Sequence, residues 1–305
     1  MKRTSLSADR RRLQARNNLG FLLYVAPALI VFLLFKYWPI VFSAILSFFQ
    51  WNFVGSMKWV GLKNYASMFH KAAFLLGARN TLIYIVGLFP FFVVFPLLFA
   101  VLLEKIAPRG IQTAFKSLLF IPTILAFAIV CMVWMWMFNP NFGLLNNVTS
   151  WFGLPRVAWL SDPNTALFSI ILVTGWKIMG SNMILYMAGL VAISREYVEA
   201  ATIDGASSWH VFWRIKWPLL TPTTLFVMVT AINYAAEKAF TPINILTKGG
   251  PAEASTNLSH VIYVFGFTYF NIGLASATAI FTSAFFFFIT KAMMQASGGF
   301  SYYEN

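Results

Sequence analysis

The sequence predicts an all-α protein that crosses a membrane six times. Its 305 residues are 59% hydrophobic and only 10% charged, and the mean hydropathy is +0.73. This composition is far more apolar than that of an ordinary soluble domain. Apolar segments of about 20 residues, the length that spans a bilayer, alternate with short polar breaks. The chain is long enough for one membrane domain with short loops, and it leaves no room for a large soluble domain.

Six segments are long and apolar enough to be transmembrane helices. In chain order they are residues 19–42, 81–103, 117–138, 166–192, 218–240 and 273–294. An alternative for the first is a longer helix that is kinked at Pro39 and continues to Phe49.

The breaks between these spans are rich in loop-forming and charged residues. They cover residues 104–110, 139–141, 193–217 and 247–251. The domain prediction is therefore a basic cytoplasmic tail, a six-helix membrane domain and a short cytoplasmic C-terminal tail, over residues 1–18, 19–296 and 297–305.

Basic residues predict the orientation, because they stay on the cytoplasmic side when loops are short. With the N-terminus inside, the outer side holds only Lys58, Lys63, Lys71, Arg79, Arg156 and Lys248. The cytoplasmic side then holds most of the rest, which places both termini and the loop 193–217 in the cytoplasm. The net charge of +13 is largely this asymmetry, so nucleic acid is not an expected partner.

The loop 193–217 is predicted to hold a short helix that binds a soluble partner. Ser194 can cap its start, and Gly205 suits the left-handed conformation that ends many helices. Between them, Ala200 and Ala201 keep one side of the helix thin, so that a partner's backbone can approach closely. A second helix along the membrane surface is expected after Gly205.

This loop carries a resemblance to a known family. The run from Tyr197 to Ala206 (YVEAATIDGA), followed by Phe212, Ile215, Pro218 and Pro222, resembles the EAA loop of bacterial binding-protein-dependent ABC importer permeases. Further matches resemble the maltose-type carbohydrate-uptake branch; they are residues 59–65 (WVGLKNY), 80–81 (NT), 121–122 (IP), 136–140 (WMFNP), Trp176 and residues 189–190 (GL).

The resemblance implies the type I permease fold of ABC importers, in the bacterial inner (plasma) membrane. It implies that the chain forms half of a translocation path for a sugar or oligosaccharide, with glycerol phosphate or another polyol derivative as the alternative. The implied partners are a second permease subunit in a heterodimer, an ATPase dimer, an extracytoplasmic solute-binding protein and membrane lipid. The residues implied to dock on the ATPase are Glu199, Ala200, Ala201, Asp204 and Gly205.

The sequence gives no sign of enzymatic chemistry. It lacks the Gly-x-x-x-x-Gly-Lys-Ser/Thr loop that cradles nucleotide phosphates, so ATP and Mg²⁺ are expected on the partner ATPase and no cofactor on this chain. The histidines His70, His210 and His260 are scattered singly and lack metal-ligand spacing. We therefore expect no catalytic, cofactor-binding or metal-binding residue.

Two polar stripes inside the spans are candidates for the substrate path. The fourth span carries Thr174, Lys177 and Ser181 on one face, and the fifth carries Thr230, Asn233 and Glu237. A charge at the bilayer centre costs about 2.5 to 3.5 kcal/mol on insertion scales, so these residues need water or partners. They either line a path in which hydroxyl and amide groups replace the water around a sugar, or are structural, with Lys177 paired to a neighbouring helix or subunit and Glu237 at the outer interface.

Two other function classes are the alternatives to an importer subunit. An ion-coupled secondary transporter would show inverted repeats and helices interrupted at the midplane, and neither is visible in the sequence. A structural membrane scaffold would leave the two polar stripes unexplained.

Overall fold

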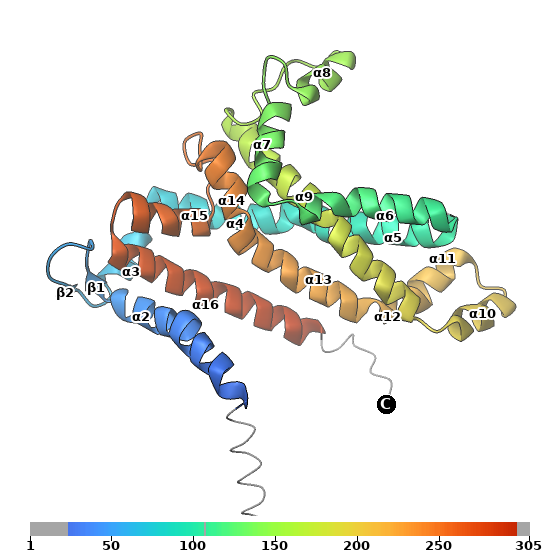
Figure 1. Cartoon of the computed structure of the whole chain (residues 1–305), viewed down its shortest axis with the longest axis horizontal. Coiled ribbons are helices and arrows are strands. Elements are labelled where there is room, and N and C mark those ends of the chain that lie inside the picture. Colours follow the sequence, from blue (N-terminus) through green and yellow to red (C-terminus); the bar gives the residue numbers. More distant parts are fainter. Residues whose placement is uncertain (1–23, 107, 298–305) are drawn as a thin grey trace, which may run out of the picture.

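The fold is a bundle of long helices with short helical segments at both ends (Figure 1). The computed structural model describes residues 24–106 and 108–297. Within these residues the only strands are β1 (Phe49–Gln50) and β2 (Lys58–Trp59), which pair antiparallel with Phe49 opposite Trp59. The all-α prediction is confirmed.

Four of the six predicted spans are single helices. The first covers residues 24–46 and contains the π-helical segment η1 (Leu33–Tyr37) and α2 (Trp38–Leu46). The second runs through α4 (Ala72–Phe89), η2 (Pro90–Val94) and α5 (Phe95–Ile106). The fourth is α9 (Pro163–Ala192), and the sixth is α16 (Ile272–Ser297).

The other two spans are bent pairs of helices. In the third, α6 (Arg109–Ile124) and α7 (Phe127–Met137) meet at 103°. In the fifth, residues 208–219 and 221–247 meet at 64°. The first arm of the fifth span contains α11 (Ser208–Val211), η3 (Phe212–Lys216) and α12 (Trp217–Leu219), and the second contains α13 (Thr221–Asn233), η4 (Tyr234–Lys238), α14 (Phe240–Pro242) and η5 (Ile243–Thr247).

A proline lies close to the bend of the third span, but a proline within a span does not always produce a bend. Pro122 lies inside α6, where it donates no backbone hydrogen bond. The chain becomes extended three residues later at Leu125 and Ala126. Pro39 behaves differently, because the first span runs through it without a break and changes to π-helical hydrogen bonding just before it.

The remaining elements lie outside the spans or fold back among them. They are α3 (Lys63–Met68), α8 (Leu144–Trp151), α10 (Arg195–Ile203), α15 (Leu258–Tyr263) and η6 (Val264–Thr268).

The loop that precedes α15 is held inside the bundle by the second span. Asn80 Nδ2 donates to the carbonyl oxygens of Glu253 at 3.2 Å and Ala254 at 3.0 Å. Tyr84 Oη donates to the carbonyl oxygen of Ser255 at 2.7 Å. Side chains of α4 thus satisfy backbone groups of this loop, and α15 packs on α4 and α16.

The fourth span, α9, is the centre of the packing. Of its most apolar stretch, 61% of the residues are buried, against 6% for the first span. Its neighbours include α4, α5, α6 and α13. A span with this much buried surface is positioned to connect the loop 193–217 that follows it with the rest of the bundle.

Candidate coupling and translocation sites

The helix predicted in the loop 193–217 is present as α10, with the expected residues at both ends. The hydroxyl of Ser194 accepts the backbone N–H of Glu196 at 3.3 Å. At the other end, Gly205 has φ = +80°. Its N–H donates to Thr202 O at 3.0 Å, and the N–H of Ala206 donates to Ala201 O at 2.9 Å. These two bonds form a Schellman motif, which satisfies carbonyls at the helix end and favours glycine at the left-handed position.

No residue of α10 is buried. Ile203 is 86% exposed, although apolar side chains of this size are usually covered in folded proteins. An isolated helix of nine residues is only marginally stable in water. The side chains of Glu199, Ala200, Ile203 and Asp204 are exposed, and Ala201 is half-buried.

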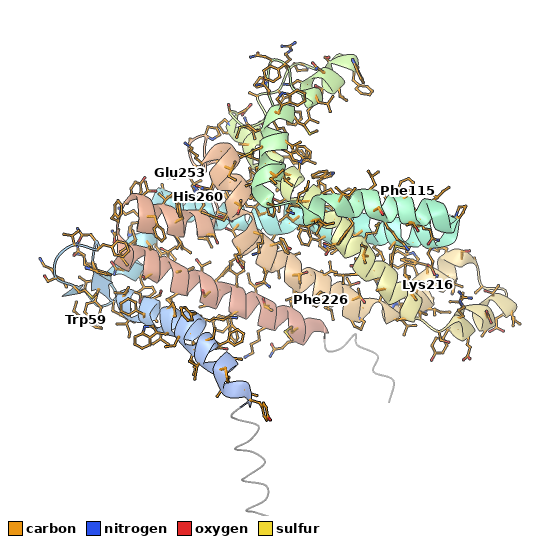
Figure 2. The ribbon with its side chains drawn as sticks, in the orientation of Figure 1. Trp59, Phe115, Lys216, Phe226, Glu253 and His260 are labelled. Atoms are coloured by element: carbon orange, nitrogen blue, oxygen red, sulfur yellow. The ribbon has the colours of Figure 1, made fainter. Side chains whose placement is uncertain are left out.

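The first arm of the fifth span, which follows α10, is tied to the second span by an ion pair. Lys216 Nζ, in η3, lies 2.9 Å from Glu104 Oε1 and 2.8 Å from Oε2, in α5. Its side chain is 19% exposed and that of Glu104 is 36% exposed. In the part of the chain that the structure describes, the other ion pair joins the sequence neighbours Glu237 and Lys238. Lys216–Glu104 is thus the ion pair that links two separate elements there, and Lys216 is labelled in Figure 2.

The polar stripe of the fifth span lies on an exposed face. Asn233 and Glu237 are exposed and Thr230 is half-buried, whereas Val227 and Ala231 on the same helix are buried. The hydroxyl of Thr230 donates to Val227 O at 2.8 Å, and Asn233 Nδ2 donates to Val229 O at 3.0 Å. The side chain of Glu237 is 75% exposed.

The stripe of the fourth span lies inside the bundle instead. Thr174 is fully buried, and its hydroxyl has no hydrogen-bond partner among the described residues. Ser181 is half-buried and donates to Ile178 O at 2.8 Å. Lys177 is 5% exposed, and its ammonium group binds backbone carbonyls of α6. The two stripes are therefore not joined by any hydrogen bond within residues 24–106 and 108–297.

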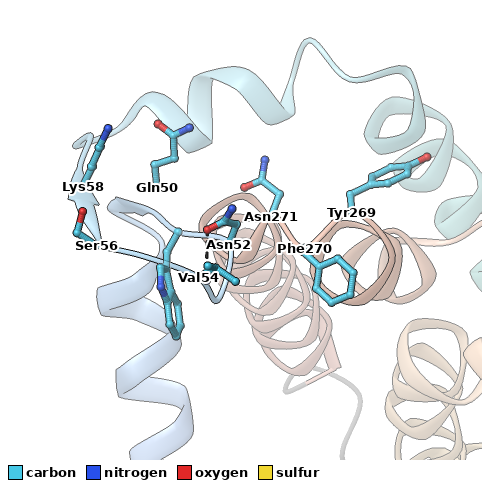
Figure 3. A pocket seen from close by; sticks show the side chains of 9 residues that line it. Gln50, Asn52, Val54, Ser56, Lys58, Tyr269, Phe270 and Asn271 are labelled. Carbon is cyan, nitrogen blue, oxygen red and sulfur yellow. Dashed lines mark hydrogen bonds between the residues drawn. The ribbon is translucent and has the colours of Figure 1, made fainter.

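One hollow lies far from both stripes and was not anticipated from the sequence. It has a volume of about 420 Å³ and is open to the surface, between the β1–β2 loop and the segment before α16 (Figure 3). Its lining residues include Gln50, Asn52, Lys58, Tyr269 and Asn271. Figure 1 places β1 and β2, next to which the hollow lies, and α10 at opposite ends of the molecule.

The described residues hold no group of three or more His, Cys, Asp or Glu side chains that could bind a metal ion. His260, for example, lies against Thr256 Oγ1 at 3.0 Å.

Comparison with known proteins connects these features to one family. The family described as "Binding-protein-dependent transport system inner membrane component" matches residues 80–298. The probable ABC transporter permease protein YurN of Bacillus subtilis is 36% identical over 260 residues, which are 84% of this chain and 88% of YurN. The sn-glycerol-3-phosphate transport system permease protein UgpA of Agrobacterium fabrum is 32% identical over 261 residues, 85% of this chain and 87% of UgpA.

Solved structures agree with the sequence relatives. A bacterial ABC transporter involved in the import of the acidic polysaccharide alginate contains a chain with a TM-score of 0.81 and 26% identity, covering 95% of this chain and 100% of that chain. A second alginate transporter structure, in complex with an alginate pentasaccharide-bound periplasmic protein, gives a TM-score of 0.80 at 26% identity and covers 94% and 97% of the two chains.

Proposed function

The chain belongs to the family of binding-protein-dependent transport system inner membrane components and is a permease subunit of an ABC importer; from this premise we propose that it imports a sugar or oligosaccharide and is driven through α10. Family membership decides against the ion-coupled secondary transporter and the membrane scaffold. The fold is the type I permease fold.

The exposure of α10 is the observation that carries the coupling proposal. α10 is a short helix with a defined start and end but without buried residues. We therefore expect another protein to cover its exposed surface. We propose that the protein which binds α10 is an ATPase dimer and that this dimer holds the ATP and Mg²⁺. ATP-driven closure of the ATPase dimer moves α10 as a rigid lever, and the permease pair changes between inward-facing and outward-facing states.

A second permease subunit, in a heterodimer, is proposed to complete the path beside α13. The exposed positions Phe226, Asn233 and Glu237 follow one face of this span. A charged group that faced lipid at this depth would be costly, so the face is better placed against water or another subunit. We propose that Thr230, Asn233 and Glu237 line the path, and that Thr174 and Ser181 contribute from α9 when the helices move.

The orientation follows from this arrangement. The α10 end faces the cytoplasm, both termini lie there, and the β1–β2 end faces outward toward a solute-binding protein. Support comes from the alginate transporter, whose structure contains a periplasmic protein.

The substrate class is proposed from the relatives, and glycerol phosphate is the second candidate because the UgpA proteins are similar over most of the chain. An uptake assay separates the two. Proteoliposomes that contain the full transporter and its binding protein are given a labelled oligosaccharide or labelled glycerol 3-phosphate. Saturable, ATP-dependent uptake of the oligosaccharide, without competition by glycerol 3-phosphate, is expected; the reverse pattern supports the second candidate.

A further inference from the structure

The break in the third span leaves backbone carbonyls that need donors. α6 ends at Ile124, and α7 begins at Phe127 after a bend of 103°. The last carbonyls of a helix have no partner within the helix, and a polar group left unpaired in a membrane costs several kcal/mol. Pro122, which has no N–H to donate, also lies in this last turn.

Lys177 supplies the missing donors from the neighbouring span. Its Nζ lies 3.0 Å from the carbonyl oxygens of both Pro122 and Thr123 and 2.7 Å from that of Leu125. A lysine ammonium has three N–H donors, so each one has an acceptor. The positive charge also lies at the negative end of the α6 dipole, and the ring of Phe127 is 5.0 Å away, within cation–π range.

The same contact is fixed from the other side. Thr123 Oγ1 donates to the carbonyl oxygen of Lys177 at 2.8 Å. One turn further along α9, a Cβ at position 180 would collide with the carbonyl oxygen of Leu119, so Gly180 permits the close approach of the two backbones. We call Lys177, Thr123 and the three carbonyls that Lys177 binds the clamp.

We propose that Lys177 is a positioning residue which holds the break of the third span on α9, so that α6 and α7 move together with the coupling helix. α9 ends at Ala192 and α10 begins at Arg195. A movement of α10 would therefore be passed directly to α9. Because all three N–H groups of Lys177 bind carbonyls, a substrate would have to break one of these bonds to reach the ammonium. The proposal rests on the proposed function for its transport consequence, and not for the geometry of the clamp.

The geometry is tested by a distance measurement across the break. Spin labels are placed at Phe115→Cys in α6 and Met132→Cys in α7, which are 50% and 66% exposed, in the assembled transporter with Cys131→Ala. Lys177→Met is expected to broaden or shift the distance distribution, because three carbonyls lose their donor. Thr123→Val, which removes a single hydrogen bond, is expected to shift it in the same direction by less.

An unchanged distribution in Lys177→Met overturns the clamp. If Lys177→Met does not accumulate in the membrane, Thr123→Val decides, and an unchanged distribution in that variant overturns the proposal equally. Lys291→Met is the matched control, since it removes an exposed lysine from α16 and is expected to leave the distribution as it is.

The transport consequence is tested by kinetics in proteoliposomes. A positioning role lowers the maximal uptake rate of Lys177→Met about tenfold while the KM for substrate stays within about twofold. A raised KM with an unchanged maximal rate would instead identify Lys177 as a substrate contact and overturn the proposal. The distance measurement does not require transport, so failure of the proposed importer leaves the test of the clamp intact.

Discussion

A charged side chain within a membrane span has two possible explanations, and its neighbours distinguish them. The ammonium of Lys177 binds three backbone carbonyls, two in the last turn of α6 and one at Leu125, whereas the side chain of Glu237 is 75% exposed. The sequence placed both in polar stripes and left a structural role open for each. Exposure and hydrogen bonding favour the structural role for Lys177, whereas the proposed path role stays with the other residues of the two stripes.

Residues that act within their own helix could be predicted from the sequence, and residues that act across helices could not. Ser194 and Gly205 were recognised because capping depends on neighbours within about four positions. The acceptors of Lys177 lie 52 to 55 positions away in the chain. Nothing in a local pattern indicates which distant carbonyls will be left unpaired.

Gly205→Val tests the stop of the coupling helix. Valine at φ = +80° is strained by roughly 1 kcal/mol or more, and the Schellman bonds that close α10 are distorted. We expect ATP-driven uptake to fall sharply while the abundance of the protein in the membrane is unchanged, as measured by uptake and immunoblotting.

Gly153→Val is the matched control for this variant. Gly153 also has a positive φ, +70°, with open space around its Cα, but it follows α8 rather than α10. Normal uptake is expected from Gly153→Val. Equal loss in both variants would assign the effect to backbone strain alone and contradict the docking role.

At the scale of elements, length and apolarity were enough to locate the spans but not their bends. Each predicted span is present as a helix or a bent pair. The sharp turn after α6 was missed, because a proline such as Pro122 is compatible with a kink as well as with a break. α15 and η6 were missed because residues 258–268 are too short to span a membrane, and their place depends on Asn80 and Tyr84 in the second span.

Cysteine labelling tests which face of α13 meets water. Cysteines at Thr230 and Asn233, in a Cys131→Ala background, are expected to react with a small water-soluble thiol reagent in the assembled transporter. Val227→Cys and Ala231→Cys serve as controls on the buried face and are expected to stay inert. Substrate is expected to slow labelling at 230 and 233, as measured by mass spectrometry; equal labelling of both faces would remove the basis for a path along this stripe.

A charge exchange tests whether the Lys216–Glu104 pair transmits force. A partly exposed ion pair contributes only about 0.2 to 1 kcal/mol to stability, so the single variants Lys216→Glu and Glu104→Lys are expected to fold. We expect each to place like charges together and to reduce the uptake obtained per ATP hydrolysed, and the double exchange to restore most of it. Failure of the double exchange to restore coupling, with normal abundance, would show that the pair is not used in this way.

At the scale of the whole molecule, the surface is that of a subunit rather than of a complete transporter. The first span is the least buried of the four single-helix spans, and its exposed side chains include Phe35 and Trp38. Figure 1 shows it diverging from the bundle, with contacts to α16. Together with the exposed α13 face and α10, this gives the chain the surfaces that the proposal assigns to lipid, a second permease and an ATPase.

Cross-linking from α10 tests the central claim most directly. A photoreactive amino acid is placed at Ile203, which is 86% exposed on α10, and in a control chain at Trp151, which is 79% exposed on α8. The photoreactive residue replaces a large apolar side chain in both chains. The helices α10 and α8 lie in different parts of the molecule (Figure 1). The account predicts that Ile203 forms a covalent adduct with the ATPase subunit in the assembled transporter and that Trp151 does not. No adduct from Ile203, or an ATPase adduct from Trp151 in its place, would contradict the assignment of α10 as the coupling helix.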